Sequence, residues 1–564
     1  YFHNWTGNRI TCRDWFQLCL KEGLTVFRDQ EFSADQRSRQ TQRIKDVIRL
    51  RARQFPEDAG PLAHPVRPEN IASIDNLYTA TVYEKGAELI RVLKRLIGDD
   101  AFARGMDLYF DRFDGSAATI EDFYSCFETA SSRDLTTFRL WYAQAGTPKV
   151  EIEETWTAAT GVYALHFKQT TDQTPGQEHK SPVTIPLACA LLDGEGGHVV
   201  SENWPNGERL VILDETSTAV KIELGPGAKK PLLSVNRGFT SPIILERSVS
   251  VEERLHLAAS ETDAFNRWDA FQSLIFDAIL AEADGADLGA DHLVDALARA
   301  AEDSSGDDPA YAALMLRTPD TGELMLAQSP ARPVDLHAAR LAFRGRIAAR
   351  LDDFFEATLK STPPSPFSPD AAQAGIRALR GAAMALKSSL GKSSGASLRA
   401  LYDAAPDMTE SLAALRALCV AQGEDCDVAL DDFYNRWRSD PLVLDKWFAA
   451  QAGVATVETV RQLTAHRDFD LNNPNRVRSV VATFAIQNLA AFHAPNGEGH
   501  TFLADTVEQV DKLNPALAAR LLTAFETWRR LEPEARHSAQ SVLERLSAAG
   551  LSKNASDILS RTLG

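Results

Sequence analysis

The chain has 564 residues, with 78 Asp or Glu against 60 Lys or Arg, and a formal net charge of −18. The length suggests roughly three to four domains, and a hydrophobic fraction of 44% argues against wholesale disorder. Because the charge balance is acidic and no apolar run of about 18 residues occurs, we expect no nucleic-acid partner and no membrane span.

The six cysteines include no C-x-x-C pair, and six are too few to staple a chain of this length. This excludes a disulfide framework and a zinc ribbon. A reducing compartment fits this cysteine usage, and we expect a cytoplasmic location. The chain opens at Tyr1 without an initiating Met, so we expect a fragment or a processed product, and any targeting signal upstream of Tyr1 would lie outside this sequence.

The first part of the chain, up to about residue 147, has mostly helical patterns. Helices are predicted over 83–97 and 101–113, and another is predicted to begin at Thr119. The pattern Thr11-x-x-Asp14 predicts a capping box ahead of an earlier helix.

From about 148 to 246 the apolar residues alternate with a period of two. Alternating runs occupy 163–167, 183–191 and 220–224, and Gly-containing turn signals separate them. Several short alternating strands of this kind predict a small β-sandwich.

From about 247 to 564 the pattern is helical again, and it has no strict sequence period. Many short helices over this length favour an α-solenoid of irregular helix pairs. A single irregular helical bundle is the alternative.

The first residues that could carry chemistry are His3 and Glu22, which flank a turn-like segment, Asn4-Trp5-Thr6-Gly7-Asn8. Imidazole and carboxylate are both zinc ligands. Taken alone, a single His–Glu pair is more typical of ordinary surface or core contacts than of a metal site. In zinc peptidases, however, a helical His-Glu-x-x-His motif precedes a third ligand, and Tyr1-Phe2-His3 fits the end of that motif.

At this point the sequence resembles the aminopeptidase N family of gluzincin zinc peptidases, in its bacterial form. The stretch 1–32 resembles the segment with the second zinc histidine and the zinc glutamate, and Tyr83-Glu84-Lys85-Gly86 resembles the motif of the transition-state tyrosine. The resemblance covers essentially the whole chain. It continues in segments that resemble markers of the lineage rather than chemistry: 114–118, 144–148, 266–269, 445–448 and 473–476.

The resemblance implies a multidomain α+β fold. Residues 1–147 would be the mostly helical C-terminal part of a thermolysin-like catalytic domain, residues 148–246 a small β-sandwich, and residues 247–564 an α-helical superhelix. It also implies a monomer that acts on peptide substrates and uses one zinc ion per complete chain to remove the N-terminal amino acid.

The resemblance further assigns roles to individual residues. His3 and Glu22 would bind zinc, and the hydroxyl of Tyr83 would stabilise the oxyanion that forms at the scissile carbonyl. Asp29, seven residues beyond Glu22, and Tyr78 are weaker candidates for the pocket of the substrate's first side chain. A structural role is equally open for both.

The first zinc histidine, the general-base glutamate and the amine-binding motif of this family would precede Tyr1. We therefore expect the 564-residue chain alone to be inactive. One alternative is a non-catalytic interaction protein whose helical solenoid binds a partner and whose metallopeptidase part is degenerate. Another is a different gluzincin hydrolase, for example an endopeptidase.

Overall fold

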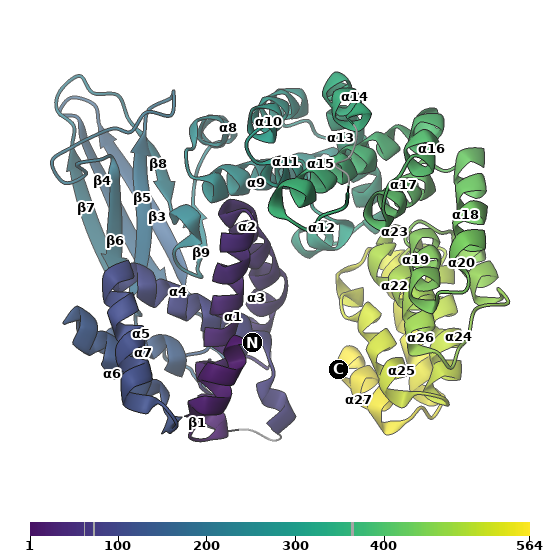
Figure 1. Cartoon of the computed structure of the whole chain (residues 1–564), viewed down its shortest axis with the longest axis horizontal. Coiled ribbons are helices and arrows are strands. Elements are labelled where there is room, and N and C mark those ends of the chain that lie inside the picture. The colour runs from purple at the N-terminus through teal and green to yellow at the C-terminus, as the bar shows by residue number, and fades with distance from the viewer. Residues whose placement is uncertain (61, 71–73, 362–365) are drawn as a thin grey trace. The chain divides into compact units, whose positions relative to one another are not determined.

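The computed structural model describes residues 1–60, 62–70, 74–361 and 366–564 (Figure 1). They form two compact units, Tyr1–Phe271 and Gln272–Gly564. The boundary falls inside one helix, α9 (Ala264–Ala283).

The first unit begins with a helical part that contains a pair of two-residue strands, and short 3-10 and π turns (η) join its α-helices. Its elements are η1 (Phe2–Asn4), η2 (Trp5–Arg9), β1 (Thr11–Cys12), η3 (Trp15–Gln17), α1 (Leu18–Gln36), α2 (Arg39–Arg49), η4 (Leu50–Gln54), α3 (Phe55–Asp58), η5 (Ile74–Leu77), η6 (Thr81–Lys85), α4 (Gly86–Ile97), α5 (Asp99–Phe113), β2 (Ala117–Ala118), α6 (Ile120–Ser131) and α7 (Thr136–Ala143).

The helices predicted at 83–97, 101–113 and from Thr119 are confirmed as η6 with α4, as α5 and as α6. Thr119 caps α6 in a full capping box with Asp122. The capping box predicted for Thr11 and Asp14 is wrong. Thr11 pairs with Ala117 in the short parallel β1–β2 ladder, and Asp14 caps η3 by accepting from the backbone N–H of Phe16.

The second part of this unit is a sandwich of two sheets. One has the strand order β7-β4-β3-β9 and the other β6-β5-β8, and alternate residues of both sheets form the buried core between them. The predicted β-sandwich is thereby confirmed. Its strands are β3 (Lys149–Thr157), β4 (Val162–Thr170), β5 (Ile185–Leu192), β6 (Glu208–Leu213), β7 (Ser217–Glu223), β8 (Leu232–Val235) and β9 (Ile244–Arg247), followed by α8 (Val251–Ser260).

The second unit is helical in its described residues. Its longer helices are α10 (Ala290–Ser305), α13 (Pro333–Arg350), α14 (Asp352–Lys360), α15 (Ala371–Lys387), α16 (Gly395–Asp403), α17 (Met408–Ala421), α18 (Glu424–Trp437), α19 (Pro441–Ala452), α20 (Val457–Thr464), α24 (Glu498–Asp511), α25 (Pro515–Leu522), α26 (Pro533–Ala548) and α27 (Lys553–Leu563). Shorter turns are α11 (Pro309–Met315), α12 (Thr321–Ala327), η8 (Ser388–Ser394), α21 (Pro474–Val477), η9 (Arg478–Ala482), α22 (Thr483–Gln487) and α23 (Leu489–Phe492), with η10 (Thr523–Phe525) and η11 (Trp528–Arg530).

Helices that are neighbours in sequence pack on one another through most of this unit, as the solenoid prediction requires. Long-range contacts depart from that pattern, because α12 and α13 also pack on α23. A further one consists of two backbone hydrogen bonds. Ala331 donates its backbone N–H to the carbonyl of Arg530 at 2.7 Å and accepts from the N–H of Glu532 at 2.9 Å. This contact, which we call the 331–531 clasp after the bridge it forms between Ala331 and Leu531, joins segments 200 residues apart.

Candidate metal and catalytic site

The structure brings His3 and Glu22 together. His3 lies in η1 and Glu22 lies in the second turn of α1, and the distance from His3 Nε2 to Glu22 Oε2 is 3.2 Å. The Glu22 side chain is 8% exposed and that of His3 is 35% exposed. The pair therefore sits at the surface of the first unit, with its carboxylate held inside and its imidazole accessible.

The His3 imidazole lies directly against the backbone at Gly7. A Cβ atom at this position would lie 2.6 Å from His3 Nδ1 and 3.0 Å from His3 Cε1. Only a residue without a side chain lets the ring lie this close to the η2 backbone. The sequence analysis placed Gly7 in a turn and gave it no role, because the contact depends on how that turn folds back on His3.

The pair fits two donors of one zinc ion. Zinc binds imidazole nitrogen and carboxylate oxygen at about 2.0–2.2 Å with tetrahedral angles, which places two such donors about 3.3 Å apart. The observed 3.2 Å matches this spacing. Among the described residues, no group of three or more His, Cys, Asp or Glu side chains could hold a metal ion, so the pair has no third donor of these types beside it in the described part of the chain.

Tyr83 lies beside this pair, on η6, which is one turn of π-helix. Burial, followed by the negative charge of Glu22 and a hydrogen bond to it, raises the pKa of the Tyr83 hydroxyl above its usual value. The hydroxyl therefore stays protonated at neutral pH and can donate a hydrogen bond. The ring of Tyr78 lies next to it, with ring centroids 6.3 Å apart, and Tyr78 is 51% exposed.

Asp29 lies outside this group. It is seven residues beyond Glu22 on α1, about 10 Å further along the helix axis, and its side chain is exposed. The structure therefore groups His3, Glu22, Tyr83 and Tyr78, and it leaves Asp29 apart from them on the same helix.

Two glycines set the distance between Glu22 and Tyr83, because α1 crosses the η6–α4 junction at Gly23 and Gly86. A Cβ atom on Gly23 would lie 2.8 Å from the carbonyl carbon of Gly86, and one on Gly86 would lie 3.3 Å from Gly23 Cα. The two backbones thus touch directly. Each glycine adjoins the site, one next to Glu22 and the other three residues after Tyr83.

Glu57 holds the N-terminal end of η6. Its carboxylate accepts from the backbone N–H of Ala80 at 3.2 Å and of Thr81 at 2.8 Å, and from the Thr81 hydroxyl at 2.6 Å. These three bonds satisfy donors that the start of a helix leaves open. The turn that carries Tyr83 is therefore fixed at its beginning.

A buried ion pair holds the other end of η6. Lys85 donates to Asp58 at 2.7 Å and to the Gly146 carbonyl at 3.0 Å, and neither charged side chain is more than 1% exposed. Burial works against ionisation of Asp58, but the charge of Lys85 prevails and keeps the pKa of that carboxyl below its usual value. The N–H of Gly146 also donates to Asp58, at 2.7 Å.

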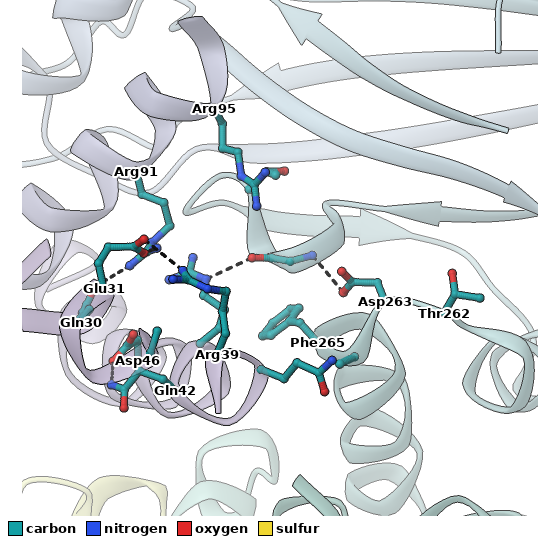
Figure 2. Close-up of a pocket in the computed structure, with 16 residues that line it drawn as sticks. Gln30, Glu31, Arg39, Gln42, Asp46, Arg91, Arg95, Thr262, Asp263 and Phe265 are labelled. Carbon is teal, nitrogen blue, oxygen red and sulfur yellow. Dashed lines mark hydrogen bonds and ion pairs between the residues drawn. The ribbon is translucent and has the colours of Figure 1, made fainter. Parts of the chain in front are cut away.

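At the far end of α1, residues of α1, α2 and α4 line a polar cavity of about 260 Å³ together with the turn at Gly238 and the segment 262–265 (Figure 2). Arg91 of α4 donates to Glu31 at 2.6 Å and to Gln30 at 2.8 Å, and Arg39 donates to Glu31 at 3.0 Å. Although burial opposes it, Arg91 and its neighbours lower the pKa of Glu31 to about 2. These charged contacts join α1 to α4 a second time, beyond the glycine crossing.

Three family models match the chain in succession. The Peptidase family M1 domain matches residues 1–142, and a domain of unknown function with an Ig-like fold (DUF3458) matches residues 146–248. A domain of unknown function with ARM repeats (DUF3458_C) matches residues 251–564, more than half of the chain. Aminopeptidase N of Caulobacter vibrioides is 48% identical over 572 aligned residues, which cover 100% of this chain and 65% of that protein. The chain belongs to the aminopeptidase N family.

Aminopeptidase N of Escherichia coli is 38% identical and matches 97% of this chain and 64% of its own length. Among solved structures, an aminopeptidase A of Legionella pneumophila in complex with aspartic acid aligns with a TM-score of 0.80 at 28% identity, covering 100% of this chain and 64% of that one. This member of the aminopeptidase N family thus spans less than two thirds of the relatives it matches.

These comparisons confirm the predicted fold class: a helical M1 segment, an Ig-like β domain and a helical ARM-repeat domain. Peptidases of the M1 family are zinc enzymes. Within the described part of the chain, no helix combines the length and the apolar composition that a membrane span requires.

Proposed function

We propose that the protein containing this chain is a zinc-dependent aminopeptidase that hydrolyses the N-terminal peptide bond of peptides. The observation that carries the proposal is the grouping of His3, Glu22 and Tyr83, which lie in three separate elements and meet at one point. His3 Nε2 and a carboxylate oxygen of Glu22 would hold the zinc ion. When bound, zinc supplies Lewis acidity to the scissile carbonyl and to the attacking water.

Tyr83 supplies a hydrogen bond where negative charge develops. Its hydroxyl keeps its proton, because burial and the nearby Glu22 disfavour the phenolate. A donor of this kind strengthens its bond as the carbonyl oxygen becomes an oxyanion, so it lowers the barrier without tightening substrate binding.

We extend the proposal to the weaker candidates. Tyr78, half-exposed next to Tyr83, would line the pocket of the substrate's first side chain. Asp29, further along α1, would border the same pocket. Six free cysteines support a reducing, cytoplasmic location, and we propose a monomer. We also propose these domain bounds for the chain: a truncated catalytic part (1–147), a β-sandwich (148–246) and a helical superhelix (247–564).

The test is turnover by the complete protein with Tyr83→Phe. Loss of one oxyanion donor should lower kcat by about 10²–10³-fold, with KM and zinc content nearly unchanged. Hydrolysis of alanyl-anilide and of its N-acetylated form, with and without a zinc chelator, would be followed together with zinc content by elemental analysis. We expect chelator-sensitive cleavage of the free-amine substrate alone.

Tyr78→Phe is the matched control. It removes the same hydroxyl from the neighbouring ring, and we expect a change in kcat of less than about fivefold. Wild-type kcat in the Tyr83→Phe protein would refute the role of Tyr83. Equal cleavage of the acetylated substrate would refute the aminopeptidase assignment and favour an endopeptidase.

A further inference from the structure

Cys419 and Cys426 face each other across the turn between α17 and α18. Their sulfur atoms are 3.8 Å apart, and the two residues are 3% and 7% exposed. The turn is tight because Gln422 (φ 59°) and Gly423 (φ 105°) both adopt positive φ. It reverses the chain so that residues seven positions apart come into direct contact.

The two thiols are chemically unequal. Cys426 lies in the first turn of α18, where the helix N-terminus favours a thiolate. The hydrogen bond between the sulfurs lowers the pKa of Cys426 and raises that of Cys419, whereas burial and Asp427 oppose the effect at Cys426. Its place at the helix N-terminus makes Cys426 the expected nucleophile of the pair, with Cys419 as the resolving thiol.

Other cysteines of the chain lack these features. Burial raises the pKa of Cys12 to about 11 and that of Cys189 to about 12, so both remain protonated thiols at neutral pH. Protonated thiols react slowly with oxidants, because the thiolate is the reactive form.

We propose that Cys419 and Cys426 form an oxidisable dithiol that closes to a reversible disulfide when it meets a peroxide. The Cys426 thiolate attacks one peroxide oxygen, the O–O bond breaks, and sulfenic acid and water form after one proton is taken up. The Cys419 sulfur then attacks the Cys426 sulfur, and the S–O bond breaks. The proton of the Cys419 thiol leaves with the hydroxyl group as a second water. Two thiols are thereby oxidised and one peroxide is reduced to two waters. The sulfurs must approach by less than about 2 Å to reach a bond length near 2.05 Å.

The test exposes the folded full chain to a small excess of hydrogen peroxide, alkylates the remaining thiols after unfolding, and maps peptides by mass spectrometry. We expect two of the six thiols to disappear, a disulfide between Cys419 and Cys426 to appear, and a reductant to restore both thiols. Oxidation at the other four positions should be at least tenfold slower.

Single variants separate the two roles. In Cys419→Ala, the sulfenic acid at Cys426 has no resolving thiol and should be trapped by dimedone. In Cys426→Ala, Cys419 should remain unmodified. Cys12→Ala should form the disulfide as the wild type does.

Equal oxidation rates at Cys12 and Cys426, or a disulfide that forms only in urea, would overturn the proposal. Both outcomes are read from the wild-type chain, so they do not depend on how well the variants fold.

Discussion

At the scale of single residues, the candidate site depends on a glycine as much as on its polar groups. Gly7 lets the His3 imidazole lie against the backbone of η2, where any Cβ would come within 2.6 Å of Nδ1. The ring is thereby directed with Nε2 toward Glu22. Residues that orient a metal ligand in this way affect metal affinity strongly, although they do not touch the ion.

We therefore expect Gly7→Ala to weaken zinc binding by the complete protein by about 10–100-fold. The added methyl group must push the imidazole away from its present position, and the spacing between Nε2 and Glu22 is lost. Competition with a chromophoric chelator would measure the affinity. Gly381→Ala is the control, because a Cβ at Gly381 in α15 meets nothing within 4 Å; equal zinc affinity in Gly7→Ala and wild type would contradict the role of Gly7.

At the scale of elements, the crossing of α1 with the η6–α4 junction decides whether the site exists. Gly23 and Gly86 bring the two backbones into contact, and Glu57 and the Asp58–Lys85 pair hold η6 at both ends. The distance between Glu22 and Tyr83 is therefore a property of helix packing, and neither side chain could correct a change in it.

Gly23→Ala should destabilise the first unit more than Gly86→Ala. A Cβ on Gly23 would lie 2.8 Å from the backbone of Gly86, whereas a Cβ on Gly86 would lie 3.3 Å from the backbone of Gly23. The helices must therefore separate further in Gly23→Ala. Overpacking of this kind costs about 1–3 kcal/mol, which thermal unfolding of the chain would show as graded losses of Tm. The reverse order, or no loss in either variant, would show that the crossing tolerates a side chain.

Two segments that resemble markers of the family, 445–448 and 473–476, contact each other in the second unit. Asn473 caps α21 by accepting from the backbone N–H groups of Asn475 and Arg476. Arg476 donates to Asp445 at 2.6 Å, and its guanidinium lies 4.8 Å from the centre of the Phe448 ring. These segments therefore fix one helix against another.

The sequence predicted the elements better than the contacts between them. Hydrophobic period alone located three strands of the sandwich, β4, β5 and β7, and the helices around Tyr83, because that period reflects which face is buried. The capping-box pattern failed at Thr11, where a two-residue strand depends on a partner more than 100 positions away. The roles of Gly7, Glu57 and Asp58 escaped the sequence for the same reason, since each depends on a close approach that only the fold creates. His3, Glu22 and Tyr83 were accessible through the family resemblance.

At the scale of the whole molecule, the described residues bring together two of the zinc donors that we propose, His3 and Glu22, with no third His, Cys, Asp or Glu ligand beside them. Zinc sites in enzymes use three protein ligands, so we expect the isolated chain to bind zinc weakly and to leave alanyl-anilide uncleaved. Isothermal titration with zinc, next to an assay at equal concentration of the complete protein, would measure both. Turnover comparable with that of the complete protein would refute this expectation.

A second prediction at this scale concerns acid stability. His493 and His500 are fully buried in the second unit, with His493 Nδ1 and His500 Nε2 2.9 Å apart. Burial, and for His493 also the neighbouring His500, lowers their pKa values to about 3 and about 4. Because the unfolded chain binds protons near pH 6.5 and the folded chain does not, stability is full above that pH and falls as the pH drops below it.

Between pH 8 and pH 5 the loss should be roughly 2 kcal/mol for each histidine. Urea unfolding across this range would measure it. The double variant His493→Phe with His500→Phe should lose less stability on acidification than wild type, whereas replacing the exposed His537 with Asn should change nothing. Identical acid profiles for the double variant and wild type would contradict the prediction.

The 331–531 clasp can form only late in the synthesis of the second unit. Ala331 finds its hydrogen-bond partners only after about 200 further residues have been made, which takes roughly 10–40 s at 5–20 residues per second. Throughout that interval the backbone N–H and carbonyl of Ala331 lack the partners that they have in the finished chain. A nascent chain halted before Leu531 should therefore be more sensitive to protease near Ala331 than the finished one.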